Sequence, residues 1–325
     1  MANLKLTIAL SHYDRHMPFF DGSVQAEGVD LTVLQVGQSH PLPHGQDRHE
    51  RMLQKSEFDI CELSLSSYLI AKSRGMPFSA IAVFPRRLFS LSQMWVNADA
   101  GIHAPQDLIG KKVGLSTFQT TLSVLAKGDL QSEYNIPWRE LDWYISKDEA
   151  VALKPMGNVR MQLLAPGKKM GPMLEQGEID ALMVPHPPKE ALRGGGRIRR
   201  LFADPKAEEI KYYRKNGFYP IMHVVAFKEQ VLARNPWLVK SITDAFKKAK
   251  EACVGYYDDP NWSRFVWGRH LFEEERALFG ADPWPYGIEK NRVNLARFID
   301  YSLDQGLMEK KLEVEDLFAG LSAEN

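Results

Sequence analysis

The segment FDICELSLSSYLIAKS, residues 58–73, decides the fold class. Its first half, 58–63, is predicted to form a short strand. This strand leads directly into a predicted helix over 64–73, and Ser64 is a residue type favoured at helix N-caps. A strand followed at once by a helix is the unit from which parallel sheets are built.

The same alternation extends on both sides of this segment. Residues 4–10 alternate apolar and polar side chains with the period of two that is typical of a strand. Further strands are predicted within 24–36 and at 79–84, 112–115, 143–145 and 181–184. Helices are predicted at 49–55, 119–133, 170–176, 236–256, 261–279 and 289–305. The sequence therefore predicts an α/β protein.

Two segments rich in β-forming residues, 89–97 and 218–228, are expected to cross between two lobes. Lobe one is then discontinuous, with residues 1–96 plus 221–325, and lobe two spans 97–220. Two crossover strands form a hinge, and a ligand cleft is expected between the lobes. Because ligands of open α/β sheets bind at the carboxyl ends of strands, the loops there are the candidate binding loops.

The loop after the first strand places His12, Tyr13, Asp14 and Arg15 in consecutive positions. A guanidinium can hold a carboxylate or phosphate through two parallel hydrogen bonds. The imidazole of His12 can exchange a proton near neutral pH. The alternative is an ordinary polar loop with a surface ion pair between Asp14 and Arg15.

Two further loops of lobe one carry candidate residues. Glu62 precedes Ser64 and Ser66, whose hydroxyls lie where a helix begins and can bind an anion or only cap the helix. Arg86 and Arg87 follow the strand at 79–84 and can clamp a carboxylate or pair with surface acids.

Lobe two and the second crossing segment add three more candidates. Thr117 and Gln119 lie in the matching loop of lobe two and offer a hydroxyl and an amide, or serve only as part of a helix cap. His223 lies inside an apolar crossing strand, so its ring must find a hydrogen-bond partner. It is either a satisfied core histidine or a residue of the cleft.

Composition excludes several classes of protein. The 325 residues contain 41 Lys and Arg and 41 Asp and Glu, so there is no basic excess of the kind that nucleic-acid-binding proteins usually show, although a local basic patch is left open. No apolar run approaches the roughly 18 residues of a membrane span. No leader is visible at the N-terminus, so a cytoplasmic location is expected, or a periplasmic one if a native leader has been removed.

Metal and cofactor signals are weak. His40, His44 and His49 lie close together, but their spacing matches no strong zinc pattern, and a metal there is left open. Two cysteines are too few for a disulfide framework. The common phosphate-cradling, dinucleotide-binding and hydrolase motifs are missing from the sequence, so no cofactor is expected.

Short motifs spread over nearly the whole chain carry a family resemblance. They lie at 13–15, 27–31, 51–53, 58–68, 84–85, 177–182, 220–225, 284–287, 291–292, 305–307 and 317–319. In this order they resemble the 4,5-dihydroxyphthalate decarboxylase family, which is similar in fold to type II periplasmic solute-binding proteins. Phe89-Ser90 and Phe118 stand where the family usually carries Arg-His and tyrosine, so the resemblance leaves the substrate open.

The resemblance implies a cofactor-independent decarboxylase of a hydroxylated aromatic (di)carboxylic acid such as 4,5-dihydroxyphthalate. In such chemistry a general acid protonates the ring carbon that carries the carboxylate, and carbon dioxide leaves from a desolvated pocket. The residues expected in these roles are His223 or His12 as the acid, Glu62 or Asp14 facing the phenol, and Arg15 and Arg87 holding carboxylates.

The same fold supports other functions, because fold does not dictate function. The main alternative is a solute-binding protein of the ABC-transporter type, which would bind a small organic anion without catalysis. A sensor or a pyrimidine-precursor synthesis protein is a third alternative. In each case the expected partner is a small aromatic carboxylate or another organic anion, and formation of a homo-oligomer is left open.

Overall fold

The computed structural model describes residues 3–36, 47–153, 158–194 and 196–320. The chain packs into two compact units. Unit 1 comprises Met1–Arg86, His223–Arg292 and Leu312–Asn325, and unit 2 comprises Arg87–Met222 and Val293–Lys311. The lobe boundaries expected from the sequence stay a prediction; by packing, residues 87–96 and 293–311 belong to unit 2.

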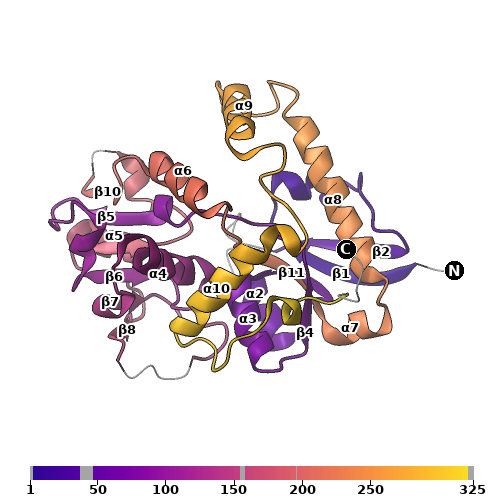
Figure 1. The fold of residues 1–325 in the computed structure, drawn as a ribbon, viewed down its shortest axis with the longest axis horizontal. Helices are drawn as coiled ribbons and strands as arrows, with labels where there is room; N and C mark the ends of the chain where they lie inside the picture. Colours follow the sequence, from indigo (N-terminus) through magenta and orange to yellow (C-terminus); the bar gives the residue numbers. More distant parts are fainter. Residues whose placement is uncertain (1–2, 37–46, 154–157, 195, 321–325) are drawn as a thin grey trace. The chain divides into compact units, whose positions relative to one another are not determined.

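The described residues of unit 1 form a mixed five-stranded sheet with the order β2-β1-β3-β11-β4 (Figure 1). Its strands are β1 (Leu4–Leu10), β2 (Val29–Gln35), β3 (Ile60–Ser64), β4 (Phe78–Ile81) and β11 (His223–Lys228). β1 runs parallel to β2 and β3, whereas β11 runs antiparallel to both β3 and β4. The first residue of β11 therefore lies at the edge where β1, β3 and β4 end.

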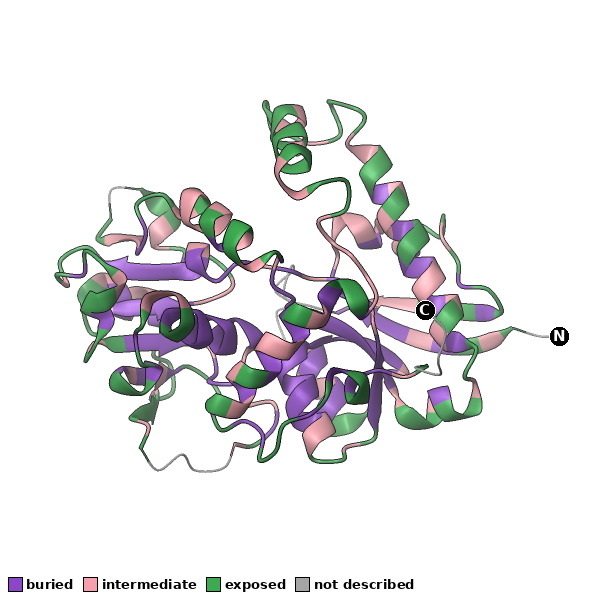
Figure 2. Cartoon of the chain, viewed as in Figure 1, coloured by how far each residue is buried: buried purple, intermediate pink, exposed green. Residues whose placement is uncertain are grey.

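The helices of unit 1 are α1 (Met17–Phe20), α2 (Arg48–Lys55), α3 (Leu65–Ser73), α7 (Glu229–Arg234), α8 (Leu238–Tyr256) and α9 (Gly268–Phe279), with 3-10 turns at Asp14–His16, Glu289–Asn291 and Val314–Leu317. All of these helices except α9 bury residues in the folded unit. Leu238, Ile242, Ala245, Phe246 and Ala249 recur at helical spacing along α8 and are buried against the sheet. Figure 2 shows the resulting contrast between the buried strands and the exposed outer helix faces.

The described residues of unit 2 form a second sheet with the order β10-β5-β9-β6-β7-β8. Its strands are β5 (Met94–Asn97), β6 (Lys112–Leu115), β7 (Asp142–Ile145), β8 (Met161–Leu163), β9 (Ala181–Met183) and β10 (Ile198–Arg200). The helices of unit 2 are α4 (Thr121–Tyr134), α5 (Met170–Gln176), α6 (Pro205–Asn216) and α10 (Arg292–Asp304, whose first residue ends unit 1), with 3-10 turns at Leu91–Gln93, Pro105–Leu108, Trp138–Glu140 and Ala191–Arg193.

One predicted helix is shorter than the sequence suggested. The pattern over 261–279 predicts a continuous helix, but α9 begins only at Gly268. The Asp259 carboxylate accepts the Asn261 N–H at 2.8 Å, and the Ser263 hydroxyl accepts the Phe265 N–H at 3.1 Å. Such local side-chain bonds compete with the helical hydrogen bonds and hold this stretch in turns.

The core of unit 2 contains a buried carboxyl group on α4. Asp129 accepts hydrogen bonds from Ser90 Oγ at 2.6 Å, from the Tyr212 hydroxyl at 3.2 Å and from the Tyr301 hydroxyl at 3.3 Å. Burial raises the pKa of Asp129 to about 7 despite the hydrogen bond from Ser90, and the charge of Glu133 adds to the rise. Asp129 is therefore largely protonated in the folded protein at mildly acidic pH.

This shift predicts that stability falls as the pH rises. The folded state keeps the Asp129 proton up to about pH 7, whereas the unfolded chain loses it near pH 3.8. The free energy of unfolding therefore falls as the pH rises from 3.8 to about 7, by about 1.4 kcal/mol per pH unit. The contribution of Asp129 to stability is fully present below this range. Urea unfolding from pH 4 to 8 should show the decline in the wild type and a flatter profile in Asp129→Asn. Parallel profiles would contradict the assignment.

No helix in the described part of the chain is long and apolar enough to cross a membrane.

Candidate functional site

The candidate site lies at the edge of the unit 1 sheet where three strands end and β11 begins. The register pairs His223 with Ser64 and Val225 with Glu62, so alternation places Glu62, Ser64 and His223 on one face of the sheet. Glu62 and His223 come from segments 161 residues apart in sequence. Antiparallel pairing of β11 with β3 therefore brings a carboxylate and an imidazole together.

The Glu62 carboxylate is fully buried and accepts hydrogen bonds on both oxygens. Oε1 lies 2.5 Å from His223 Nδ1 and 3.1 Å from Arg48 Nη2, and Oε2 accepts the Ser11 backbone N–H at 3.0 Å. The short contact implies that Nδ1 of His223 carries the proton and donates it to Glu62. Nε2 is then the ring nitrogen of His223 that can exchange a proton with a ligand.

Arg48, on α2, holds the Glu62 carboxylate and the neighbouring backbone in place. Its Nε donates to the Glu62 carbonyl at 2.8 Å and its Nη1 to the Val36 carbonyl at 3.2 Å, while Nη2 faces the Glu62 carboxylate. The side chains of Arg48 and Glu62 are both fully buried. A buried ion pair with every partner in place is hard to break, because removing either member leaves an uncompensated buried charge.

The burial and charge of this cluster fix its protonation. Burial alone would raise the pKa of Glu62, but the positive charge of Arg48 and the hydrogen bond from His223 hold it well below its usual range. Burial lowers the pKa of His223 to about 3, opposed by Glu62 and reinforced by the charge of Arg86. At neutral pH the ligand-free cluster thus contains an ionised Glu62, a charged Arg48 and a neutral His223.

A second layer of imidazoles supports the cluster. His49 Nδ1 accepts the Ser64 N–H at 3.1 Å, and its ring meets the His223 ring edge-on at 5.1 Å between centroids. His16 is fully buried, and its Nδ1 lies 2.8 Å from the Ser11 carbonyl. Burial lowers the pKa of His16 to about 4, opposed by the charge of Glu62.

Sequence reasoning missed Arg48, His16 and the supporting role of His49. A signal for α2 was available, because Arg48 and His49 each precede by four residues the apolar Met52 and Leu53. The face of α2 that buries Met52 and Leu53 also buries Arg48 and His49. Charged residues on the apolar face of a short helix indicate buried partners.

The loop after β1 carries Arg15, whose guanidinium is kept in place by several contacts. Arg15 Nε donates to the Pro85 carbonyl at 2.6 Å, and Arg15 Nη1 donates to Asp14 at 3.1 Å. The guanidinium lies 4.1 Å from the Tyr13 ring centroid and 4.3 Å from the Trp284 ring centroid. Asp14 also accepts the Tyr257 hydroxyl at 2.6 Å. The Asp14–Arg15 ion pair that the alternative of an ordinary polar loop implied is present, but both side chains are partly buried and four neighbours contact them.

The remaining unit 1 candidates lie around the same sheet edge. Arg86 is half-buried, and its carbonyl accepts the His223 N–H at 3.3 Å. Ser64 is the N-cap of α3, with its hydroxyl accepting the Ser67 N–H at 3.5 Å, and Ser66 is buried in the first turn. His12 is half-buried with its ring 5.2 Å from that of Phe20. Its role as the acid stays an alternative.

Three predicted site residues lie in unit 2 and make structural contacts there. Arg87 is buried and donates from Nη1 to the Tyr219 carbonyl at 2.6 Å. Thr117 Oγ1 lies 2.6 Å from Thr120 Oγ1, and Gln119 Nε2 donates to the Val151 carbonyl at 2.6 Å. Their part in ligand binding stays a prediction.

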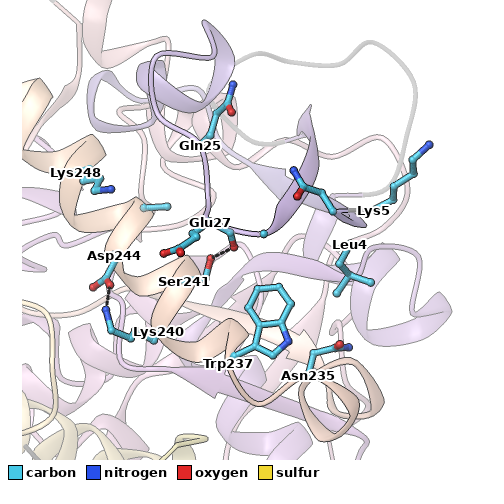
Figure 3. A pocket seen from close by; sticks show the side chains of 13 residues that line it. Leu4, Lys5, Gln25, Glu27, Asn235, Trp237, Lys240, Ser241, Asp244 and Lys248 are labelled. Atoms are coloured by element: carbon cyan, nitrogen blue, oxygen red, sulfur yellow. Dashed lines mark hydrogen bonds and ion pairs between the residues drawn. The ribbon is translucent and has the colours of Figure 1, made fainter. Parts of the chain in front are cut away.

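Two hollows on unit 1 differ in character. One of about 370 Å³ lies between α8, α9 and residues 281–284, and its lining includes Asp14 and Arg15. A wider one of about 800 Å³ lies beside α8 and the start of β1 (Figure 3). It contains none of the predicted site residues, and two of its charged side chains, Lys240 and Asp244, pair with each other at 2.5 Å.

The sequence leaves open whether a metal ion binds near His40, His44 and His49. His40 and His44 lie outside the described residues. Within the described ranges, no group of three or more His, Cys, Asp or Glu side chains is placed to hold a metal ion.

Comparison with known proteins adds relatives in sequence. The chain is 31% identical over 334 residues to 4,5-dihydroxyphthalate decarboxylase of Comamonas testosteroni, covering all of this chain and 99% of that protein. It is 31% identical over 221 residues to the protein of the same name from Pseudomonas putida, covering 66% of this chain and 83% of the relative. Residues 25–129 match the family model described as NMT1/THI5 like.

Among solved structures, the alkanesulfonate-binding protein SsuA from Xanthomonas axonopodis pv. citri, bound to MOPS, is similar with a TM-score of 0.58. The two chains are 13% identical, and the match covers 98% of this chain and 99% of the other. Similarity at this level shows the fold alone. The expected two-lobed α/β fold of the type II periplasmic-binding-protein kind is confirmed.

Proposed function

The chain belongs to the 4,5-dihydroxyphthalate decarboxylase family, and from this premise we propose that it is a cofactor-independent carboxy-lyase acting on a hydroxylated aromatic (di)carboxylic acid. The observation that carries the proposed mechanism is the buried pair of Glu62 and His223, in contact at 2.5 Å. A carboxylate that fixes one nitrogen of an imidazole leaves the other nitrogen oriented for proton transfer.

The reaction needs one proton and releases one carbon dioxide. Protonated His223 delivers the proton from Nε2 to the ring carbon that carries the carboxylate, forming a C–H bond and a non-aromatic intermediate. The bond from that carbon to the carboxylate then breaks, and its electron pair restores the aromatic ring. A ring hydroxyl ortho or para to this carbon supplies electron density to the step. His223 ends neutral and takes a new proton from solvent.

Substrate binding supplies the negative charge that raises the pKa of His223, so that its ring takes up a proton from solvent. In the ligand-free protein the low pKa of His223 keeps the ring neutral, because burial disfavours its charged form. A dicarboxylate brings two negative charges and raises the pKa of a neighbouring imidazole. Glu62, already ionised and hydrogen-bonded to Nδ1, stabilises the imidazolium that forms. Proton uptake is thus coupled to binding of the anion.

Arg15 is proposed to hold a substrate carboxylate that is not lost. Its guanidinium is kept in place by Pro85 and Asp14 and is flanked by the rings of Tyr13 and Trp284. A guanidinium held in this way can bind a carboxylate without first losing side-chain freedom. Arg86, whose charge acts on His223, is the second candidate cation.

Arg15→Lys is expected to raise KM about tenfold or more with a smaller change in kcat, since a lost charged hydrogen bond costs about 1.5–3 kcal/mol of binding. Initial rates against substrate concentration measure both constants. The matched control is Arg139→Lys, because Arg139 also stacks on a tryptophan, Trp138 at 4.2 Å, and pairs with an aspartate, Asp304 at 3.2 Å. Equal KM values for wild type and Arg15→Lys would remove Arg15 from the site.

The test of the proposed function is a panel of aromatic hydroxy- and dicarboxylic acids, scored for carbon dioxide release and for thermal stabilisation on the same samples. Release from a hydroxylated dicarboxylate, with the ligand raising the melting temperature, supports the decarboxylase. Stabilisation without release would favour the alternative of an organic-anion-binding protein. That alternative rests on the likeness in fold to a sulfonate-binding protein.

A further inference from the structure

The ring of His16 carries a buried hydrogen-bond acceptor that the proposed mechanism does not use. His16 is fully buried, and its Nδ1 lies 2.8 Å from the Ser11 carbonyl oxygen. A carbonyl oxygen only accepts, so Nδ1 carries the proton and Nε2 presents a lone pair. Within the described ranges, Nε2 has no hydrogen-bond partner. An unsatisfied buried acceptor is costly, so this nitrogen is expected to meet a donor when the protein works.

The Ser11 hydroxyl is a second buried polar group of this kind in the same turn. Ser11 is 1% exposed, and among the residues that the structure describes its Oγ has no hydrogen-bond partner. The Ser11 backbone is already paired, since its N–H donates to Glu62 Oε2 at 3.0 Å and its carbonyl accepts from His16. A hydroxyl group of a ligand both donates and accepts, so one such group can satisfy Ser11 Oγ and His16 Nε2.

The two carboxylates expected to face a substrate phenol are already paired. Glu62 accepts hydrogen bonds on both of its oxygens, as described above. Asp14 does the same, with Oδ1 accepting the Arg15 backbone N–H at 2.7 Å and Oδ2 accepting the Tyr257 hydroxyl at 2.6 Å. The charge of Glu62 acts on His16, so the His16 ring is part of the same polar cluster and brings an acceptor that a ligand can use.

We propose that His16 Nε2 accepts the hydrogen of a ring hydroxyl of the substrate, while the Ser11 hydroxyl donates to the same oxygen. This inference rests on the proposed function, in which a ring hydroxyl supplies electron density to the carbon that is protonated. It makes the substrate a phenol rather than any aromatic dicarboxylate. A site built to hydrogen-bond a hydroxyl rejects the analogue that lacks it, because buried polar groups are then left unpaired.

The phenol ring of Tyr13 lies beside both His16 and Arg15. Tyr13 is half-buried, its ring centroid lies 5.2 Å from that of His16, and it lies 4.1 Å from the guanidinium of Arg15. Because His16 is fully buried, a ligand must displace a side chain to reach it. Arg15 keeps its contacts with Pro85 and Asp14 when Tyr13 moves. A substrate whose carboxylate binds Arg15 and whose ring takes the place of Tyr13 brings its hydroxyl to His16.

The proton of the ring hydroxyl moves to His16 and back during the reaction. When His223 protonates the ring carbon, an electron pair of the hydroxyl oxygen forms the C=O bond of a dienone, and the hydroxyl proton passes to Nε2. When carbon dioxide leaves, the electron pair of the broken bond restores the ring, the C=O pair returns to oxygen, and the oxygen takes the proton back. Burial lowers the pKa of His16 to about 4, and the charge of Glu62 opposes this. A protonated carbonyl oxygen is a far stronger acid, so Nε2 can take its proton.

The test is a thermodynamic cycle between residue 16 and the ligand hydroxyl. Calorimetry measures the dissociation constants of phthalate and 4,5-dihydroxyphthalate on His223→Asn, in which turnover is blocked. In this parent the hydroxylated ligand should bind at least about tenfold more tightly. Adding His16→Asn, which keeps a donor for the Ser11 carbonyl but removes the acceptor at Nε2, should bring the ratio below about threefold and leave phthalate binding unchanged. Adding His16→Gln, whose amide oxygen reaches the Nε2 position, should keep the preference.

A purely structural role of His16 would weaken the binding of both ligands equally and leave their ratio unchanged. His103→Asn, at an exposed histidine of unit 2, is the control and should change neither constant. A tenfold ratio that survives His16→Asn, or a parent that binds both ligands equally, overturns the proposal. If the wild type still releases carbon dioxide, only the role of His16 is wrong. If the parent binds neither ligand and the wild type releases none, the proposed function fails as well.

A second measurement needs no substitution at residue 16 and so guards against misfolding of the variants. Nitrogen NMR of His223→Asn labelled with 15N-histidine follows the Nε2 resonance of His16 directly. Adding 4,5-dihydroxyphthalate should move this resonance toward that of a hydrogen-bonded nitrogen, whereas phthalate should leave it in place. A resonance that responds equally to both ligands, or to neither while both bind, contradicts the proposal.

Discussion

His223→Asn is expected to lose between about 100-fold and 10,000-fold in kcat, the range that a positioned general acid contributes. Asparagine can still donate one hydrogen bond toward Glu62 in place of Nδ1, so the buried carboxylate keeps a partner. It has no nitrogen that titrates, and the proton that replaces the carboxyl group then has no donor. Binding of the substrate, measured by calorimetry on the inactive variant, should weaken by less than about threefold.

The rival acid provides the control for this experiment. His12 lies in the loop after β1 with its ring beside that of Phe20, whereas the Glu62 carboxylate contacts and orients the ring of His223. His12→Asn should keep kcat within about threefold of the wild type. If His12→Asn is inactive and His223→Asn is not, the acid is His12 and the mechanism proposed for the buried pair is wrong.

Glu62→Gln is expected to destabilise unit 1 by about 3–5 kcal/mol and to abolish turnover. The carboxylate accepts from three donors, His223, Arg48 and the Ser11 N–H, and an amide cannot accept from all of them. Arg48 is then left as a buried charge without its counter-ion, which accounts for the size of the loss. Urea unfolding measures the stability, and a rate assay at low temperature measures turnover of the remaining folded protein.

A second substitution separates the two effects. In the double variant Arg48→Met with Glu62→Gln, the uncompensated charge is gone, and an apolar side chain of similar length replaces it. Stability should recover relative to Glu62→Gln alone, while turnover stays lost because His223 lacks the carboxylate that holds Nδ1. Recovery of turnover together with stability would show that Glu62 acts only as a structural residue.

The sequence predicted those parts of unit 1 that depend on local pattern. The alternation over 4–10 gave the bounds of β1, and Ser64 is the N-cap of α3 as its residue type indicated. The hydrogen-bond partner expected for a histidine inside an apolar strand is also present, since His223 contacts Glu62. Each of these depends on a rule that applies within about ten residues.

The sequence analysis did not predict helix α6 or the burial of Arg48, and the two omissions have different physical causes. Helix α6 was overlooked although Asp204 and Pro205 form a good helix start, with Asp204 accepting the Ala207 N–H at 3.0 Å and Gly217 ending the helix. That signal was present and local. The burial of Arg48 is different, because a charged residue at the start of a helix is normally solvated. Its ion pair with Glu62, together with its hydrogen bonds to the Glu62 and Val36 carbonyls, makes burial favourable.

The central claim is that this protein replaces a carboxyl group on an aromatic ring with a proton delivered by His223. The most direct test incubates the wild type and His223→Asn with 4,5-dihydroxyphthalate in D2O, and follows carbon dioxide release and ring deuteration together. We expect one deuterium at the carbon that lost the carboxyl group for each carbon dioxide released, and we expect this of the wild type alone. Equal release by both proteins, or binding of the acid by the wild type without release, would contradict it.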